Sequence, residues 1–131
     1  MGQCAHTNGG NMCKHIIHAN GPDACKMDRN DSDKFLASCI LNSLELARFH
    51  GVKTISIPPI STGLLGFPVK DCAEKMIQAC TSYCSLGHTG ELTRIKFVVF
   101  EQPKFEIFQG VFEKMFDIHQ SMSKNSFSNS A

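Results

Sequence analysis

The stretch ISIPPISTGLLGFPV, residues 55–69, decides the fold that the sequence predicts. Its first three residues alternate apolar and polar, as a strand entering a core does. A glycine-bearing loop follows, and Pro68 suits the first position of a helix because the N–H that proline lacks would be unpaired there. In a strand–loop–helix unit, the loop N–H groups converge with the positive end of the helix dipole, which favours an anion such as phosphate. A plain strand-to-helix turn that needs two glycines for its dihedral angles is the alternative.

On the N-terminal side of this stretch, the sequence predicts a hairpin and a helix. Strand patterns at residues 3–7 and 14–18 flank the turn signal Asn-Gly-Gly at residues 8–10, which predicts an antiparallel pair. Asp31 or Ser32 can cap a helix that Gly51 ends. Its predicted buried stripe at helical spacing consists of Leu36, Cys39, Ile40, Leu44 and Ala47.

On the C-terminal side, the sequence predicts a helix from Pro68 to Gly87, a strand over residues 95–100 and a last helix from Pro103. The strand is nearly all apolar, as a strand covered on both faces should be. The predicted core side chains of the two helices are Val69, Cys72, Ala73, Met76, Cys80 and Tyr83 in the first, and Phe105, Phe108, Phe112, Met115, Phe116 and His119 in the second.

This order of elements predicts an α/β domain over residues 1–120, followed by a disordered tail over residues 121–131 that is rich in Ser and Asn. The two later strands should be parallel and joined by a right-handed helical crossover. Ligands of open α/β sheets bind outside the carboxyl ends of the strands. The predicted site therefore lies between the loop at residues 61–67 and the corner at residues 100–102.

Composition limits the partners and the compartment. Lys plus Arg number 13 against 12 acidic residues, so the formal charge of +1 gives no electrostatic case for a nucleic-acid or membrane partner. An odd count of 7 cysteines, with no secretory signal before them, favours an intracellular protein, cytoplasmic or nuclear.

Three other constellations of reactive side chains have simpler explanations. Cys80, Cys84 and His88 are spaced as metal ligands on a helix, but they are only three and Gly87 ends the helix, so no metal site is predicted. Cys72 near a helix start could be a nucleophile, but its periodicity points it into the core. His15 and His18 on one strand could form a catalytic pair, but histidines satisfied by hydrogen bonds are the more frequent case.

Three pieces of the sequence resemble the macro domain family of ADP-ribose-binding modules: IIHANGP at 16–22, IPPISTGLLGFP at 57–68 and VVF at 98–100. The resemblance covers roughly residues 2–118 and implies a three-layer α/β fold, with helices on both faces of a mixed sheet. It also implies that the loop amides cradle a diphosphate and the distal ribose, and that Phe100 stacks on adenine. At Leu65 the family often has an aromatic residue, so a stacking contact is lost there. The implied ligand-binding residues are Ser61, Thr62, Gly63, Leu64, Leu65, Gly66, Phe67, Phe100 and Glu101.

Compared with the family pattern, the chain lacks the first strands and the first helix, so we expect an N-terminal truncation. One absent strand would lie between the hairpin and the parallel pair. Either both edges of that gap stay unpaired, or the hairpin pairs directly with the strand at Ile55.

The function implied by the resemblance is binding of ADP-ribose or of mono-ADP-ribosylated proteins, weakened by truncation, with no cofactor beyond the ligand. An ADP-ribosyl hydrolase and an inactive truncated product are the alternatives. Asp71 and Glu101 are the acids nearest in sequence to the two predicted ligand loops.

Overall fold

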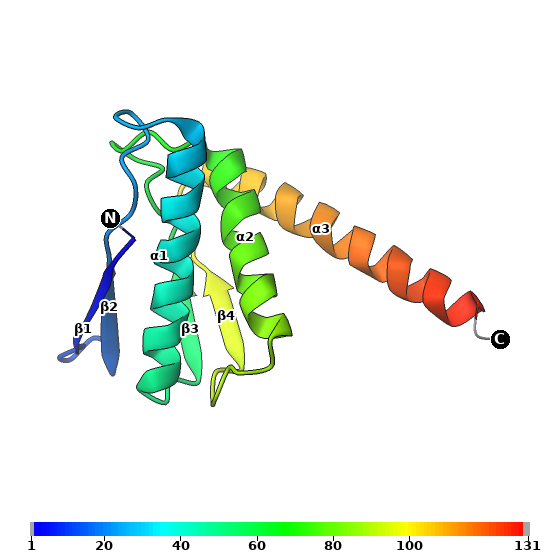
Figure 1. The fold of residues 1–131 in the computed structure, drawn as a ribbon, viewed down its shortest axis with the longest axis horizontal. Coiled ribbons are helices and arrows are strands. Elements are labelled where there is room, and N and C mark those ends of the chain that lie inside the picture. Colours follow the sequence, from blue (N-terminus) through cyan, green and yellow to red (C-terminus); the bar gives the residue numbers. More distant parts are fainter. Residues whose placement is uncertain (1, 130–131) are drawn as a thin grey trace.

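The computed structural model describes the backbone of residues 2–129 and the side chains of residues 2–116. Its elements follow the predicted order, with boundaries that shift by a few residues (Figure 1). In chain order they are β1 Cys4–Asn8, β2 His15–Ala19, α1 Arg29–Phe49, β3 Thr54–Ile57, α2 Val69–Ser85, β4 Arg94–Phe97 and α3 Gln102–Asn129.

The four strands form two separate sheets in the described part of the chain. β1 and β2 pair antiparallel, with Cys4 opposite Ala19, which confirms the predicted hairpin. β3 and β4 pair parallel, with Thr54 opposite Arg94, as the crossover through α2 predicts. Within residues 2–129 no hydrogen-bonded ladder joins the two sheets, so the hairpin does not pair directly with β3.

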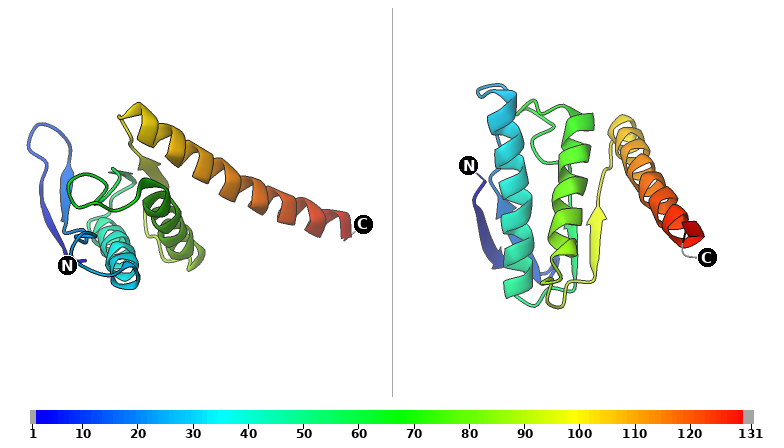
Figure 2. Two further views of the ribbon diagram at one scale, coloured as in Figure 1. Left: turned by 90° about the horizontal axis from the view of Figure 1, so that it is seen from above. Right: turned by 45° about the vertical axis from the view of Figure 1, so that its right-hand side comes forward.

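The helices α1 and α2 lie side by side against the strands (Figure 2). α1 packs on the hairpin and α2 packs on α3. α3 begins beyond β4 and then runs away from the rest of the molecule (Figure 1).

The ends of α1 are set by local chemistry. Asp28 is the N-cap, and its side chain accepts a hydrogen bond from the N–H of Asp31 at 2.9 Å. The cap therefore lies three residues before the predicted Asp31. At the other end, His50 is the C-cap and Gly51 takes a φ of +66°, which a glycine adopts at little cost.

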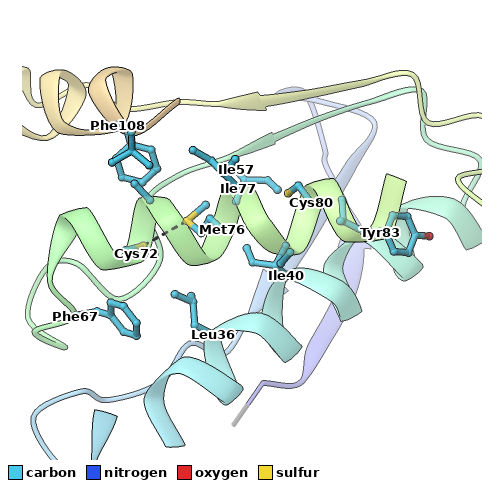
Figure 3. Packing of buried hydrophobic residues seen from close by; sticks show 14 of the residues in the cluster. Leu36, Ile40, Ile57, Phe67, Cys72, Met76, Ile77, Cys80, Tyr83 and Phe108 are labelled. Atoms are coloured by element: carbon cyan, nitrogen blue, oxygen red, sulfur yellow. Dashed lines mark hydrogen bonds between the residues drawn. The ribbon is translucent and has the colours of Figure 1, made fainter. Parts of the chain in front are cut away.

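The core lies between α1, α2, the parallel strands and the first half of α3. Figure 3 shows Leu36 and Ile40 of α1 facing Met76 of α2, while Phe108 of α3 approaches from the other side. The five predicted side chains of α1 are all fully buried, and every predicted side chain of α2 except Val69 is at most 6% exposed. Among residues 2–116, no side chain of β1 or β2 belongs to this cluster.

Two predictions about the C-terminal half are wrong. β4 ends at Phe97 and alternates exposed and half-buried side chains, whereas full cover on both faces was predicted. The apolar side of α3 is only partly used: Phe108 is buried, but the exposed fractions of Phe105, Phe112 and Phe116 are 43%, 40% and 49%. The reason is geometric: the stripe that α3 turns toward the core consists of Phe108, Val111 and Met115, so the other three phenylalanines lie at its margin. Further along, α3 points away from the rest of the molecule (Figure 1).

The side chain of His119, predicted to be in the core, lies outside the described residues. The helix α3 continues to Asn129, past the predicted boundary at residue 120. The division into a domain at 1–120 and a tail at 121–131 stays a prediction. Among the described residues, no helix combines the length and the apolar character that crossing a membrane requires.

Candidate functional site

The loop between β3 and α2 is a closed turn with two residues in the left-handed region. Ser61 has a φ of +63° and Gly66 a φ of +73°. The carbonyl oxygen of Ser61 accepts from the N–H of Phe67 at 2.8 Å, and that of Gly63 accepts from the N–H of Gly66 at 3.1 Å. A non-glycine residue with positive φ is uncommon and is often found where a site constrains the backbone.

Phe67 anchors the end of this loop in the core. Its side chain is 2% exposed, and the guanidinium of Arg29 lies 5.3 Å from the centre of its ring. The N–H of Phe67 is already bonded to the carbonyl oxygen of Ser61, and its side chain is buried. Phe67 therefore supports the loop from the core side. Phe67 is one of the residues predicted to bind the ligand; its buried side chain supports the loop, and contact with a ligand stays a prediction.

The loop forms one wall of a pocket of about 160 Å³, and the segment after β4 forms the other. Two chain segments that are distant in sequence thus meet where the carboxyl ends of two parallel strands predict a site. Four predicted residues are brought together here, namely Thr62, Gly63, Phe100 and Glu101. The remaining lining residues are Pro58, Pro59, Val99 and Lys104.

The backbone N–H groups of residues 62–65 make no intrachain hydrogen bond within the described residues. Four consecutive unpaired donors in an exposed loop can converge on an anion, as they do in phosphate-binding loops. Pro68 is the N-cap of α2 and offers no side-chain hydrogen bond to the first turn of the helix. The positive end of the helix dipole is therefore not compensated by its own cap.

Lys104 also lines the pocket, although it is not among the residues predicted from the sequence. Its Nζ lies 3.4 Å from the carbonyl oxygen of Thr62, 3.5 Å from the hydroxyl of Thr62 and 3.4 Å from Oε1 of Glu101. With only 22% of its side chain exposed, Lys104 holds a positive charge at the junction of the two walls. The available signal was its place in the first turn of α3, three residues after Glu101.

Phe100, Leu64 and Leu65 are exposed to different extents. Phe100 is 86% exposed at the pocket rim, so one face of its ring is available to a planar ligand. Leu64 is fully exposed, and Leu65 is 37% exposed. The carbonyl of Leu65 accepts from the N–H of Ala24 at 2.9 Å, which ties this side of the loop to the segment after β2.

The two glycines of the loop have different roles. A Cβ added at Gly63 would have no heavy atom within 4 Å, so this face of the backbone is open to a ligand. A Cβ added at Gly66 would lie 2.5 Å from the Sγ of Cys25, and its φ is positive. Gly63 therefore keeps the pocket accessible, whereas Gly66 allows the loop to pack against Cys25.

The hydroxyl of Ser61 is buried and has no hydrogen-bond partner among the described residues. A Cβ added at Gly21 would lie 2.4 Å from this oxygen, so Ser61 faces the segment that follows β2. It does not line the pocket. Within the predicted site, Ser61 contributes the bent backbone that presents residues 62–65.

The other reactive side chains that the sequence suggested lie apart from the pocket or are buried. Burial raises the pKa of the Cys72 thiol to about 12, and its Sγ lies 3.3 Å from the carbonyl oxygen of Ile60, so it is a poor nucleophile. Burial also raises the pKa of Cys80 to about 12, while Cys84 is exposed. No cluster of metal-ligating groups in the described residues contains these cysteines.

His15 and His18 do not form a pair. They lie three residues apart on β2 and so project from opposite faces, because side chains alternate along a strand. Nδ1 of His15 lies 2.8 Å from Nε2 of His6, and Nε2 of His18 lies 2.8 Å from the hydroxyl of Thr7.

Comparisons with known proteins agree with this arrangement. The family model described as Macro domain matches residues 1–76. A macro domain-containing protein of Caldanaerobacter subterraneus is 34% identical over 115 residues, which cover 87% of this chain and 63% of that protein. The ADP-ribose glycohydrolase MACROD2 of Homo sapiens is 30% identical over 105 residues, which cover 80% of this chain and 24% of that protein.

Among solved structures, an Oceanobacillus iheyensis macrodomain with ADP has a TM-score of 0.80 and 26% sequence identity. The match covers 88% of this chain and 60% of that one. The chain thus spans less than two thirds of the length of each of these three proteins.

Proposed function

The chain belongs to the macro domain family, and on this premise we propose that it binds ADP-ribose, free or attached to a protein. The proposed site is the pocket between the loop after β3 and the first turn of α3. The observation that carries the proposal is the meeting of unpaired loop amides, a lysine ammonium and an exposed aromatic ring in that one pocket.

Each part of the ligand has a chemically suitable partner in this site. The N–H groups of residues 62–65 can donate to diphosphate oxygens, and the ammonium of Lys104 supplies a compensating charge. The ring of Phe100 can stack on adenine. Glu101 can accept from a ribose hydroxyl at the rim.

The size of the pocket decides how much of the ligand it can enclose. Ligand pockets commonly measure about 300–1,000 Å³, whereas this one measures about 160 Å³. It can enclose a diphosphate group with part of a ribose, and the adenine would then lie outside on Phe100. The open side of the pocket leaves room for an ADP-ribosylated protein as the partner.

The relatives support the choice of ligand. The Oceanobacillus iheyensis structure carries ADP, and the human relative is named an ADP-ribose glycohydrolase. The cysteines of this chain are all free, which supports placement in a reducing compartment, cytoplasmic or nuclear.

Hydrolysis of ADP-ribosyl bonds is the alternative activity, and neither of the two acids nearest in sequence to the ligand loops favours it. A general base must reach the attacking water. Asp71 is held by Arg29 at 2.8 Å, and Glu101 lies 3.4 Å from the ammonium of Lys104. Incubation with an ADP-ribosylated protein, followed by detection of released ADP-ribose, distinguishes a hydrolase from a binding module.

Isothermal titration calorimetry with ADP-ribose tests the binding proposal. Gly63→Val should abolish binding, because the new side chain would fill the open space over the loop amides. The matched control is Gly110→Val in α3, where a Cβ likewise meets nothing within 4 Å. We expect the control to bind as the wild type does, and both variants to unfold at similar urea concentrations. Equal affinity of Gly63→Val and the wild type would place the site elsewhere.

A further inference from the structure

Three histidines meet at the opposite end of the molecule from the pocket. His6 and His15 lie on the hairpin, and His50 is the C-cap of α1. The hairpin turn and this end of α1 are at the bottom of Figure 1, whereas the loop after β3 is at the top. The register explains the first contact: His6 is opposite Ile17, so His15 is its diagonal neighbour on the same face of the hairpin.

The three imidazole rings are in direct contact. Nε2 of His6 lies 2.8 Å from Nδ1 of His15, within hydrogen-bond distance. The rings of His6 and His50 stack with centroids 3.6 Å apart and planes inclined by 18°. One ring nitrogen from each histidine lies within 4.8 Å of the other two.

The three rings have no acidic partner in the part of the chain that the structure describes. No carboxylate of the described residues forms an ion pair with any of the three. A cluster that served only as a charged network would need such an acid. A neutral imidazole needs none, and it is the commonest metal ligand in proteins.

We propose that His6, His15 and His50 bind a divalent transition-metal ion, Zn²⁺ in particular, with water completing a four-coordinate site. Three histidines and one water are an established donor set for zinc. The three residues are half-buried, so an ion can reach the rings from solvent. The negative end of the α1 dipole at His50 also favours a cation at this position.

Binding requires small movements that the cluster allows. Two nitrogens bound to one zinc at about 2.0–2.1 Å lie roughly 3.3–3.4 Å apart in a tetrahedral site. The His6–His15 pair must therefore open slightly from 2.8 Å, and His50 must turn its nitrogen inward from the stacked arrangement.

Metal binding by the His6–His15 pair releases no proton to solvent. The N–H shared between His6 and His15 belongs to one of these rings. On metal binding it shifts to the other nitrogen of that ring, so that both facing nitrogens present lone pairs.

Such an ion would fasten the hairpin to the end of α1. The hairpin makes no ladder with β3 and β4, and its side chains are absent from the core cluster within residues 2–116. A metal held by the paired strands β1 and β2 and by the α1 cap would add a bond between the hairpin and α1, whose present links include ring stacking and a few hydrogen bonds. Because the ion binds only when these elements are assembled, it would stabilise the folded state.

Titration of the whole chain with Zn²⁺ against a competing chelator dye tests the site. The variants are His15→Ala and His50→Ala, and the matched control is His18→Ala on the other face of β2. We expect one ion per wild-type or control chain and at least about tenfold weaker binding in both variants, since even second-shell losses cost that much at zinc sites. The melting temperature should rise with Zn²⁺ in the wild type and the control only.

A spectroscopic measurement on the wild type removes the dependence on variants that fold poorly. Co²⁺ at this site should give the visible bands of a four-coordinate nitrogen complex, without thiolate-to-cobalt charge transfer in the near ultraviolet. The imidazole NMR signals of His6, His15 and His50 should shift with Zn²⁺, and those of His18 should not. Thiolate bands, or unchanged signals for the three histidines, would overturn the proposal, as would equal Zn²⁺ affinity in all variants.

Discussion

The hairpin β1–β2 and the parallel pair β3–β4 have strands of similar length but are held by different forces. Ile57 of β3 is 5% exposed in the core, and Ile55, Ile95 and Phe97 pack against the same cluster. The hairpin side chains join no such cluster within residues 2–116. Its links to α1 are mostly polar, including the hydrogen bond from Nδ2 of Asn42 to the carbonyl oxygen of Gly2 at 2.7 Å.

The size of each contribution shows what this difference means. A fully buried aliphatic side chain contributes about 1.5–3 kcal/mol, whereas one hydrogen bond contributes about 0.5–1.5 kcal/mol net. We expect the parallel pair to unfold only with the whole domain, while the hairpin can open locally. The proposed ligand pocket lies at the end of the firmly held pair, which keeps its two walls in register.

The largest expected effect tests the core directly. Ile57→Ala should lower the free energy of unfolding by about 2–5 kcal/mol, because it leaves a cavity in a packed core. Ile17→Ala on the hairpin removes a half-buried side chain and should cost less than half as much. Urea denaturation of both variants measures this. Equal losses would show that the hairpin is as firmly packed as the parallel pair.

The second effect concerns ligand affinity at the end of the parallel pair. Phe100→Ala should weaken binding of ADP-ribose by about 1–3 kcal/mol, the usual loss when an aromatic ring no longer stacks on a base. Ribose 5-phosphate has no base, so its binding should change little. The control is Phe49→Ala near the hairpin, which removes a ring of similar exposure, 81% against 86%. A loss of the same size for both ligands would mean that Phe100 only supports the pocket wall.

A third effect would separate the two regions by their dynamics. Asn42→Ala removes the hydrogen bond to the carbonyl oxygen of Gly2 and should cost about 0.5–1.5 kcal/mol. Hydrogen exchange should accelerate at Ile16 and Ile17, while protection at Ile55 and Ile57 remains. Faster exchange in both pairs would contradict local opening of the hairpin.

The smallest effect is a pH dependence of the free energy of unfolding that His6 on the hairpin causes. It is measured in metal-free buffer. The pKa of His6 is lowered in the folded state by desolvation and by His50 and His15, whereas its unfolded value is near 6.5. Above that value the residue is neutral in both states and contributes nothing. As the pH falls, the unfolded state binds the proton first, so the free energy of unfolding decreases until the lowered pKa is passed.

The contribution of His6 is measured by comparing the free energy of unfolding of the wild type and of His6→Gln at about pH 7.5 and about pH 5.5. The wild type should lose more stability on acidification than His6→Gln. An equal loss in both would exclude His6 as the source.

Much of the fold could be predicted because each helix carries its own signal. The stripe from Leu36 to Ala47 is fully buried, as its spacing predicts. The strands, their pairing and the loop after β3 also followed from local patterns. The course of α3 could not be predicted, because its apolar side is the same in sequence whether or not a partner covers it. Phe112 and Phe116 are therefore half-exposed where burial was expected.

The candidate site was predictable only in part. The two walls of the pocket follow from the rule that ligands bind at the carboxyl ends of parallel strands. Lys104 was missed because its role depends on how α3 begins, which a sequence pattern does not fix. Phe67 was assigned to the ligand because it lies in the loop motif, and the motif alone does not indicate that its side chain is buried in the core. The three histidines come from residues 6, 15 and 50, and only the tertiary structure brings them together.

The packing of Gly66 against Cys25 limits the order in which mutations can accumulate at this junction. A side chain at position 66 meets two obstacles, the Sγ at 2.5 Å and a φ of +73° that L-residues rarely adopt. Losing the thiol of Cys25 removes the first obstacle and leaves the second. We therefore expect substitutions at position 66 to stay costly whichever residue occupies position 25, because no change at position 25 removes the positive φ.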